Sequence, residues 1–184
     1  MSKKLYPMIE CAIMVALATV LSFIKIYRLP LEGEITLLSM LPICLFSIRW
    51  GIGWGFVGSG LYALIQAGIY LPTVMSWGLT PLALIGCLVF DYLLAYSVLG
   101  IAGMFRKFGT WGNIGGIALA LILRFASHLV SGTLIFGEWM PDGWGNPFIY
   151  SLAYNGSFML PELVLTAVAA FFLMKIPAVM KKPQ

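Results

Sequence analysis

The polar residues of this chain gather between Arg124 and Glu162. This stretch holds the single histidine, His128, together with acidic, amide and aromatic side chains, and it joins two very apolar segments. Polar groups at membrane depth are costly and usually face a cavity or a partner. In a chain that is 61% hydrophobic and 10% charged, this stretch is therefore the predicted functional region.

Four polar residues of this region recur with the period of one helix face. They follow the spacing i, i+3, i+4, i+7 and are Arg124, Ser127, His128 and Ser131. Such a stripe is expected to face protein or water. Two alternatives to a ligand contact stay open: a neutral imidazole bonded to a neighbouring helix for His128, and a structural clamp for Arg124.

The last apolar segment carries a second polar face. On a helix its residues form two neighbouring rows, one with Tyr150, Tyr154 and Ser157 and the other with Ser151, Asn155 and Glu162. Pro161 removes one backbone hydrogen bond from this helix and can bend it. The two rows predict a wide polar wall.

Asp91 lies inside another apolar tract, CLVFDYLLAY. An unpaired carboxylate at that depth costs on the order of 3 kcal/mol, so it needs a cation, a hydrogen-bonding partner or a proton. An ion pair with Arg124 is one interpretation. Contact with a cationic ligand is the other.

Large aromatic residues cluster near the predicted outer ends of the apolar segments: Trp77, Trp139, Trp144, Phe136 and Phe148. Each one alone is typical of the aromatic belt at a membrane interface. Together with a carboxylate, however, aromatic faces are what a flat organic cation requires of a binding site.

Composition sets the fold class. Soluble domains carry about 25% charged residues, whereas this chain of 184 residues has a mean hydropathy of +0.97. We predict one all-α integral membrane bundle over residues 1–184, with about six transmembrane helices. The predicted spans are 8–25, 35–49, 52–71, 79–104, 113–136 and 149–175. The second is short and contains Pro42, so it is expected to be tilted, kinked or incompletely spanning.

Charge placement predicts the topology. With six spans, an inside location holds most basic residues, namely Lys3, Lys4, Arg49, Arg106, Lys107, Lys175, Lys181 and Lys182. The outside loops hold Lys25 and Arg28 with four acids, Glu32, Glu34, Glu138 and Asp142. Both termini are therefore predicted to be cytoplasmic. The basic residues form no single soluble face, so nucleic acid is not an expected partner. Glu10 interrupts the first apolar segment, so we predict a retained helix rather than a signal peptide.

Several chemistries lack their motifs in this sequence. It has no phosphate-binding P-loop, no HExxH zinc motif and no GxSxG nucleophile turn. Without these motifs we predict no cofactor and no catalytic residue. Cys11, Cys44 and Cys87 lack metal-ligand spacing, so we also predict no metal site. Uphill movement of a solute would draw on an ion gradient or another subunit.

Small residues at 51, 53, 55, 58 and 60, and Ala12 with Ala16, predict close helix packing.

The segments HLVSG, Pro141 with Gly143, and NPFIYSLAYNGSFMLPE resemble the thiamine-specific substrate-binding subunits of energy-coupling factor transporters. The resemblance covers essentially the whole chain. It implies a multi-pass protein of the prokaryotic cell membrane that captures thiamine from outside, in a pocket formed by the later helices and closed by the loop after the first. A membrane coupling subunit and two cytoplasmic ATPases are the implied partners, besides membrane lipid.

The resemblance also implies roles for individual residues. His128, Tyr150 and Asn155 match ligand-contacting positions, and Asp91 with Tyr92 occupies a place where the family has Glu followed by Tyr. Further expected contacts are Tyr154 as a wall, Trp139 and Phe136 near the family's pocket tryptophans, and Glu34 in the loop that closes the pocket. In the first span, AIMVA matches the AxxxA element that docks on the coupling subunit, so Ala12 and Ala16 are the predicted docking residues.

Three other functions remain open at this point. The same architecture could serve another vitamin or a precursor. An intramembrane enzyme could use His128 and Asp91 as base and acid, provided that both reach one substrate atom. A purely structural membrane subunit would bind no ligand at all.

Overall fold

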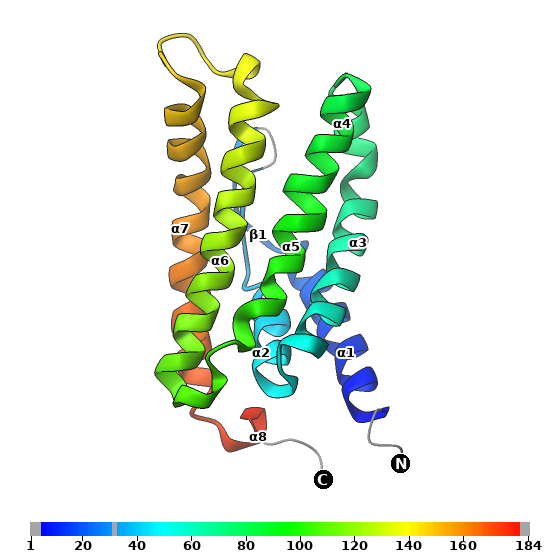
Figure 1. Cartoon of the computed structure of the whole chain (residues 1–184), viewed down its shortest axis with the longest axis vertical. Helices are drawn as coiled ribbons and strands as arrows, with labels where there is room; N and C mark the ends of the chain where they lie inside the picture. The colour runs from blue at the N-terminus through cyan, green and yellow to red at the C-terminus, as the bar shows by residue number, and fades with distance from the viewer. Residues whose placement is uncertain (1–4, 31–32, 181–184) are drawn as a thin grey trace.

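The computed structural model describes residues 5–30 and 33–180, so Lys3, Lys4, Glu32, Lys181 and Lys182 lie outside the described residues. Long helices stand side by side, and two short strands run between them (Figure 1). In chain order the elements are α1 (Leu5–Ser22), β1 (Lys25–Arg28), β2 (Glu34–Thr36), α2 (Leu41–Trp50), α3 (Ile52–Ser76), α4 (Pro81–Cys87), η2 (Leu88–Leu94), α5 (Ala95–Ser97), η3 (Val98–Gly103), η4 (Arg106–Phe108), α6 (Gly109–Leu134), η5 (Gly137–Trp139), α7 (Pro147–Leu173) and α8 (Pro177–Met180).

Among the described residues, five helical stretches are long and apolar enough to cross a membrane, and each overlaps a predicted span, with ends that differ by up to seven residues. They are Leu5–Ser22, Ile52–Ser76, Pro81–Gly103, Arg106–Leu134 and Pro147–Leu173. The exception is α2, with 10 residues. At 1.5 Å per residue it extends about 15 Å, half of the hydrocarbon core. The bundle therefore has five candidate spans and one short apolar helix, and α2 is the incompletely spanning element.

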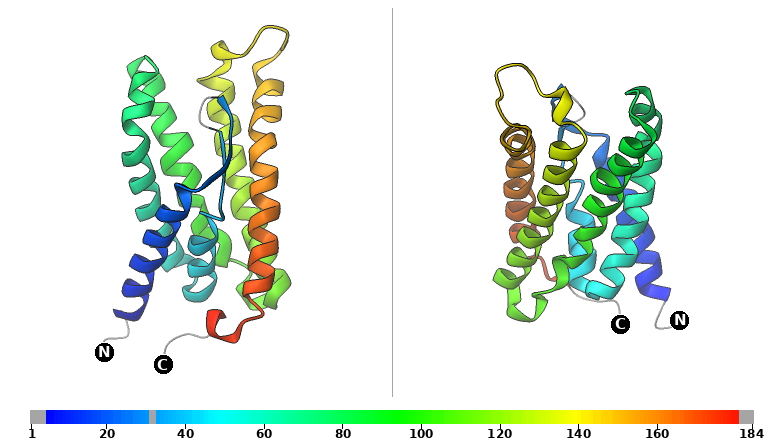
Figure 2. Two further views of the ribbon diagram at one scale, coloured as in Figure 1. Left: turned by 180° about the vertical axis from the view of Figure 1, so that it is seen from behind. Right: turned by 45° about the horizontal axis from the view of Figure 1, so that its top comes forward.

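The chain between α1 and α2 forms an antiparallel hairpin, which the all-α prediction omitted. Arg28 pairs with Glu34, and Tyr27 pairs with Ile35. The hairpin stands beside α7 in the upper half of the bundle, while α1 and α2 occupy the lower half (Figures 1 and 2). Strand pairing provides hydrogen-bond partners for the backbone N–H and C=O groups of this non-helical segment. In the upper half the chain between α1 and α2 is therefore a hairpin rather than a helix.

The lower half is closely packed around glycines. The hydroxyl of Ser47 donates to the carbonyl of Gly100 at 2.5 Å and accepts from the N–H of Gly103 at 3.0 Å. A Cβ atom on Gly55 would lie 2.4 Å from the same hydroxyl. The packing prediction holds for Gly55, whereas a Cβ on Gly60 would meet nothing within 4 Å. Close approach of α2, α3 and η3 therefore depends on only part of the glycine cluster.

One arginine joins three elements at the lower end of the bundle. Arg49 of α2 forms an ion pair with Glu10 of α1 at 3.0 Å and donates to the carbonyl of Val179 in α8 at 2.8 Å. The start of α1 and α8 lie at this same end (Figure 1). The location of this lower end on the cytoplasmic side remains a prediction from the charge distribution.

Candidate functional site

A cavity occupies the upper half of the bundle, between β2, α3, η2, α6 and α7. Its volume is about 110 Å³, whereas a single water needs roughly 10–15 Å³ on the same measure. The cavity can therefore hold a small organic molecule. It is lined by Ser22, Gly33, Glu34, Thr36, Ser39, Tyr70, Trp77, Cys87, Asp91, Tyr92, Tyr96, Arg124, His128, Gly132, Phe136, Tyr150, Ser151, Tyr154, Asn155, Phe158 and Glu162.

Asp91 enters this cavity from a local change in helix type. Residues Leu88–Leu94 form a π-helix inside the span that begins at Pro81. Such widened turns are rare and occur frequently at functional sites. The hydroxyl of Ser127 in α6 donates to the carbonyl of Phe90 at 2.6 Å, which anchors the π-helix to its neighbour. The local geometry thus presents both Asp91 and Tyr92 to the cavity.

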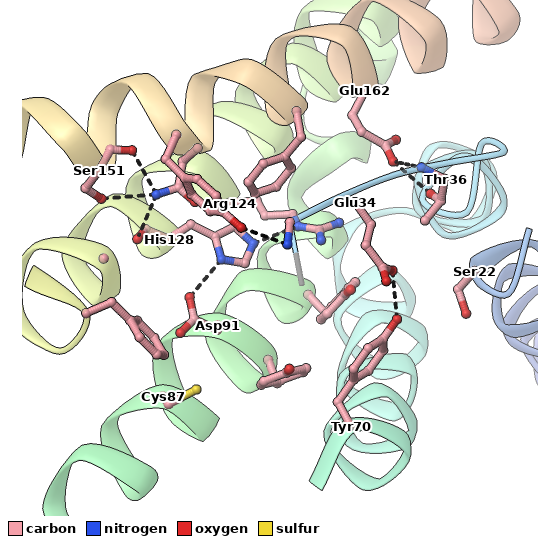
Figure 3. A pocket seen from close by; sticks show the side chains of 18 of the residues that line it. Ser22, Glu34, Thr36, Tyr70, Cys87, Asp91, Arg124, His128, Ser151 and Glu162 are labelled. Carbon is pink, nitrogen blue, oxygen red and sulfur yellow. Dashed lines mark hydrogen bonds and ion pairs between the residues drawn. The ribbon is translucent and has the colours of Figure 1, made fainter. Parts of the chain in front are cut away.

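The carboxylate of Asp91 is held by two residues of the predicted α6 stripe. Nδ1 of His128 lies 2.8 Å from Oδ1 of Asp91 (Figure 3). The hydroxyl of Ser131 donates to Oδ2. Nε of Arg124 lies 3.3 Å from Nε2 of His128. Because a guanidinium can only donate, Nε2 must accept, so the proton of a neutral imidazole is on Nδ1 and points to Asp91. The interaction of Asp91 with Arg124, one of the two interpretations of Asp91, is therefore indirect and passes through His128.

Arg124 is buried, and its guanidinium contacts an aromatic ring and a thioether sulfur. Its guanidinium lies 4.2 Å from the ring centroid of Tyr96 and donates to the sulfur of Met40. None of the ion pairs among the described residues joins Arg124 to a carboxylate. The clamp interpretation of this arginine is correct in part, because it orients His128. Its positive charge is nevertheless not neutralised by direct pairing within the described part of the chain.

Asn155 is fixed by the helix pair α6 and α7. Its amide nitrogen donates to the carbonyl of Ser151 at 2.9 Å, to the hydroxyl of Ser151 at 3.1 Å and to the carbonyl of His128 at 3.4 Å. A Cβ on Gly132 would lie 2.2 Å from the hydroxyl of Ser151, so only glycine permits this close approach. The arrangement holds the Asn155 side chain still and directs its amide oxygen away from these acceptors.

Aromatic rings form the upper walls. Tyr70 and Tyr92 have centroids 5.6 Å apart, and Trp77 meets Phe136 edge to face at 5.7 Å. Trp139 packs behind these rings, 5.6 Å from Phe136, and it is not a lining residue. The short helix η5 turns the chain after Phe136, so of the two expected contacts Phe136 faces the cavity and Trp139 does not.

Glu34 contributes a second carboxylate from β2. It accepts hydrogen bonds from Lys25, from Arg28 at 2.9 Å and from the hydroxyl of Tyr70 at 2.9 Å. Burial by itself raises the pKa of this carboxyl, but the three hydrogen bonds outweigh burial and hold the pKa below its ordinary value of 4.5. Glu34 thus remains ionised while it connects the hairpin to α3.

Tyr154 connects the same hairpin to α7. Its hydroxyl accepts from the N–H of Gly33 at 2.9 Å and donates to the carbonyl of Pro30. Its ring lies 5.9 Å from that of Tyr150. The predicted tyrosine row of α7 therefore both lines the cavity and supports the hairpin.

Eight of the nine residues expected to touch a ligand line the cavity: Glu34, Asp91, Tyr92, His128, Phe136, Tyr150, Tyr154 and Asn155. Ala12 and Ala16 are exposed on the outer face of α1. Tyr70 and Tyr96 also line the cavity and were not predicted, and Trp77, grouped above with the interfacial aromatic residues, lines it as well. The spacing of Tyr70 and Trp77, seven residues apart on one helix face, is the signal that could have found them.

A family model described as thiamine transporter protein matches residues 8–182. The thiamine transporter ThiT of Bacillus subtilis is 32% identical, and the match covers 98% of this chain and 96% of the relative. ThiT of Lacticaseibacillus paracasei is 27% identical, with 95% and 89% covered. A solved structure of ThiT from Listeria monocytogenes superposes with a TM-score of 0.80 at 26% identity, over 97% of this chain and 99% of that one.

Proposed function

Because this chain belongs to the thiamine transporter protein family, we propose that it is the substrate-binding subunit of an energy-coupling factor importer and captures thiamine from outside the cell. Family membership makes it a multi-pass membrane transport protein rather than an enzyme. Its sequence contains no P-loop. ATP-driven delivery is therefore assigned to other subunits, namely a membrane coupling subunit and two cytoplasmic ATPases.

The observation that carries the proposal is the carboxylate of Asp91 in a ring-lined cavity. Thiamine joins a permanently cationic thiazolium to a neutral aminopyrimidine. A cation removed from water needs a negative charge and aromatic faces close by. Asp91 supplies the charge in this proposal, and the hydrogen bond from His128 orients the carboxylate.

The other lining residues complete the proposed site. Tyr92, Phe136 and Tyr150 provide walls for flat rings, and the fixed amide oxygen of Asn155 accepts a hydrogen bond from the ligand's amino group. Arg124 at the same cavity opposes a second cationic group by like-charge repulsion. The site thus favours a ligand with one positive charge over a dication.

Binding by the purified protein tests this proposal. Thiamine should quench tryptophan fluorescence, because Trp77 lines the cavity, and the quenching should saturate at one ligand per chain. Riboflavin and biotin serve as controls for the alternative that another vitamin is the substrate. Saturable binding of either one, with no response to thiamine, would overturn the assignment.

The proposed docking surface is separate from the cavity. Ala12 and Ala16 lie four residues apart on the exposed face of α1, where small side chains permit close approach of a partner helix. Replacing both with Leu should leave thiamine binding by the isolated subunit unchanged and abolish uptake with the complete transporter. Exposed Ile13, replaced by Ala, is the control on the same helix. Normal uptake by the double variant contradicts the docking assignment.

A further inference from the structure

We infer that Glu162 is a positioning residue that holds the segment Thr36–Met40, here called the Thr36 turn, in a strained conformation and so controls how fast thiamine leaves the cavity. This inference rests on the proposed thiamine binding. It concerns a carboxylate that the ligand contacts proposed above do not use.

Glu162 is a buried acid on a spanning helix, with 2% of its surface exposed. One of its oxygens, Oε1, accepts two hydrogen bonds from a single residue of the hairpin: the N–H of Thr36 at 2.5 Å and the hydroxyl of Thr36 at 2.8 Å (Figure 3). A buried N–H and a buried hydroxyl are costly to leave without an acceptor. Glu162 therefore fixes the end of β2 against α7.

The Thr36 turn adopts a backbone conformation that its sequence disfavours. Leu38 has a φ of 61°, and it is the only residue other than glycine with positive φ in the described part of the chain. A bulky residue in the left-handed region is strained and persists only where its surroundings impose it. The hydroxyls of Thr36 and Ser39, 2.7 Å apart, bridge the strained residue.

The far end of the turn is held as well. The sulfur of Met40 accepts from the guanidinium of Arg124 on α6, and Met40 is 1% exposed. The turn is thus restrained by α7 at its start and by α6 at its end. Since Leu38 lies between these two anchors, the strain is imposed by the anchors.

The hairpin is the wall of the cavity that can move at least cost. Other walls belong to membrane-spanning helices, whereas an isolated two-stranded hairpin is marginally stable in water. Side-chain contacts must therefore hold it in place, and the Thr36 contact is the one buried deepest. Loss of the contact between Thr36 and Glu162 favours a hairpin that has moved away from the cavity. Relief of strain at Leu38 favours the hairpin in its present place against the cavity.

These two effects predict opposite changes in the rate of thiamine dissociation. Glu162→Ala should accelerate dissociation by about 10- to 100-fold, the range expected for leaving the two buried donors of Thr36 without an acceptor. Glu162→Gln keeps an acceptor oxygen and should accelerate it less. Leu38→Gly relieves the left-handed strain and should slow dissociation by about fivefold or more. Glu138→Ala, at an exposed carboxylate, is the matched control and should leave the rate unchanged.

A double variant separates positioning from simple destabilisation. If Glu162 imposes the strain, Leu38→Gly should lose its effect in the Glu162→Ala background. Additive effects on the dissociation rate would overturn the inference. Stopped-flow displacement of bound thiamine measures all of these rates.

Hydrogen exchange provides a test that needs no ligand. In ligand-free protein, the backbone amide of Thr36 should exchange at least tenfold faster in Glu162→Ala than in the wild type, while amides of α3 stay protected. Unchanged exchange at Thr36 overturns the inference even if thiamine binds normally. Absence of thiamine binding by the wild type would instead overturn the proposed function, with the exchange result still deciding the role of Glu162.

Discussion

The two halves of the bundle differ in packing: the lower half is closely packed, and the upper half encloses a cavity. In the lower half, glycines bring backbones into contact, as where a Cβ on Gly116 would lie 2.1 Å from the carbonyl oxygen of Ala102. The upper half replaces two helices with a hairpin and leaves a cavity lined by charged and aromatic side chains. Close packing fixes the helix directions below, and those directions keep the helices apart above. The lower half therefore acts as the scaffold, and the upper half carries the binding chemistry.

The largest expected effect is a loss of stability in the lower half. Gly116→Ala places a methyl group against the backbone of Ala102, which cannot move without shifting η3. We expect destabilisation of about 3 kcal/mol, the upper end of the usual range for overpacking, measured as a lower midpoint of thermal unfolding in detergent. Gly60→Ala meets nothing within 4 Å and is the control. It should be neutral or stabilising by about 0.5–1 kcal/mol. Equal effects of the two substitutions would refute the scaffold assignment.

A second prediction concerns the charge of the upper half. Asp91→Ala removes the carboxylate proposed to face the thiazolium and should weaken thiamine binding by about 2–3 kcal/mol, roughly 100-fold. Thermal stability should change much less than in Gly116→Ala. Titration by tryptophan fluorescence measures the affinity, with Asp142→Ala in an exposed loop as the control. A loss below threefold contradicts the proposed role of Asp91.

Smaller losses of affinity are expected at the neutral polar residues. His128→Ala and Asn155→Ala each remove a fixed hydrogen-bonding group and should weaken binding by about 1–3 kcal/mol. Ser157, replaced by Ala, is the control on the same helix as Asn155: it is exposed, and its hydroxyl donates to the carbonyl of Tyr154 at 2.7 Å. It should have no effect. Unchanged affinity in both cavity variants would remove these residues from the site.

The smallest effect is a pH dependence of the hairpin. The pKa of Glu34 lies below its ordinary value of 4.5, so its ion network stabilises the folded hairpin above that value and is lost as pH falls through the lowered pKa. Hydrogen exchange at Ile35 should therefore be constant from pH 7 to about 5, after correction for the intrinsic rate, and should rise only in stronger acid. Glu34→Gln should abolish this acid-dependent rise. A rise that begins near neutral pH would assign the transition to another group.

The length of the apolar runs predicted the spans, because lipid requires long apolar helices. Periodicity predicted the two polar faces, because residues three and four apart share a helix face. The predicted stripe from Arg124 to Ser131 lies where expected, with Arg124, Ser127 and Ser131 buried. The hairpin was not predicted, since its strands of four and three residues are too short to show an alternating pattern.

The sequence by itself determined a membrane bundle, its approximate spans and the residue types available for binding a flat cation. Only the tertiary structure decided which of them meet. It routed the interaction of Arg124 with Asp91 through His128, turned Trp77 rather than Trp139 toward the cavity, and joined Glu162 to Thr36, 126 residues apart in the chain. Helical period fixes the face on which a side chain lies. Its partner depends on a π-helix, a short turn and the packing of other elements, all set by contacts distant in sequence.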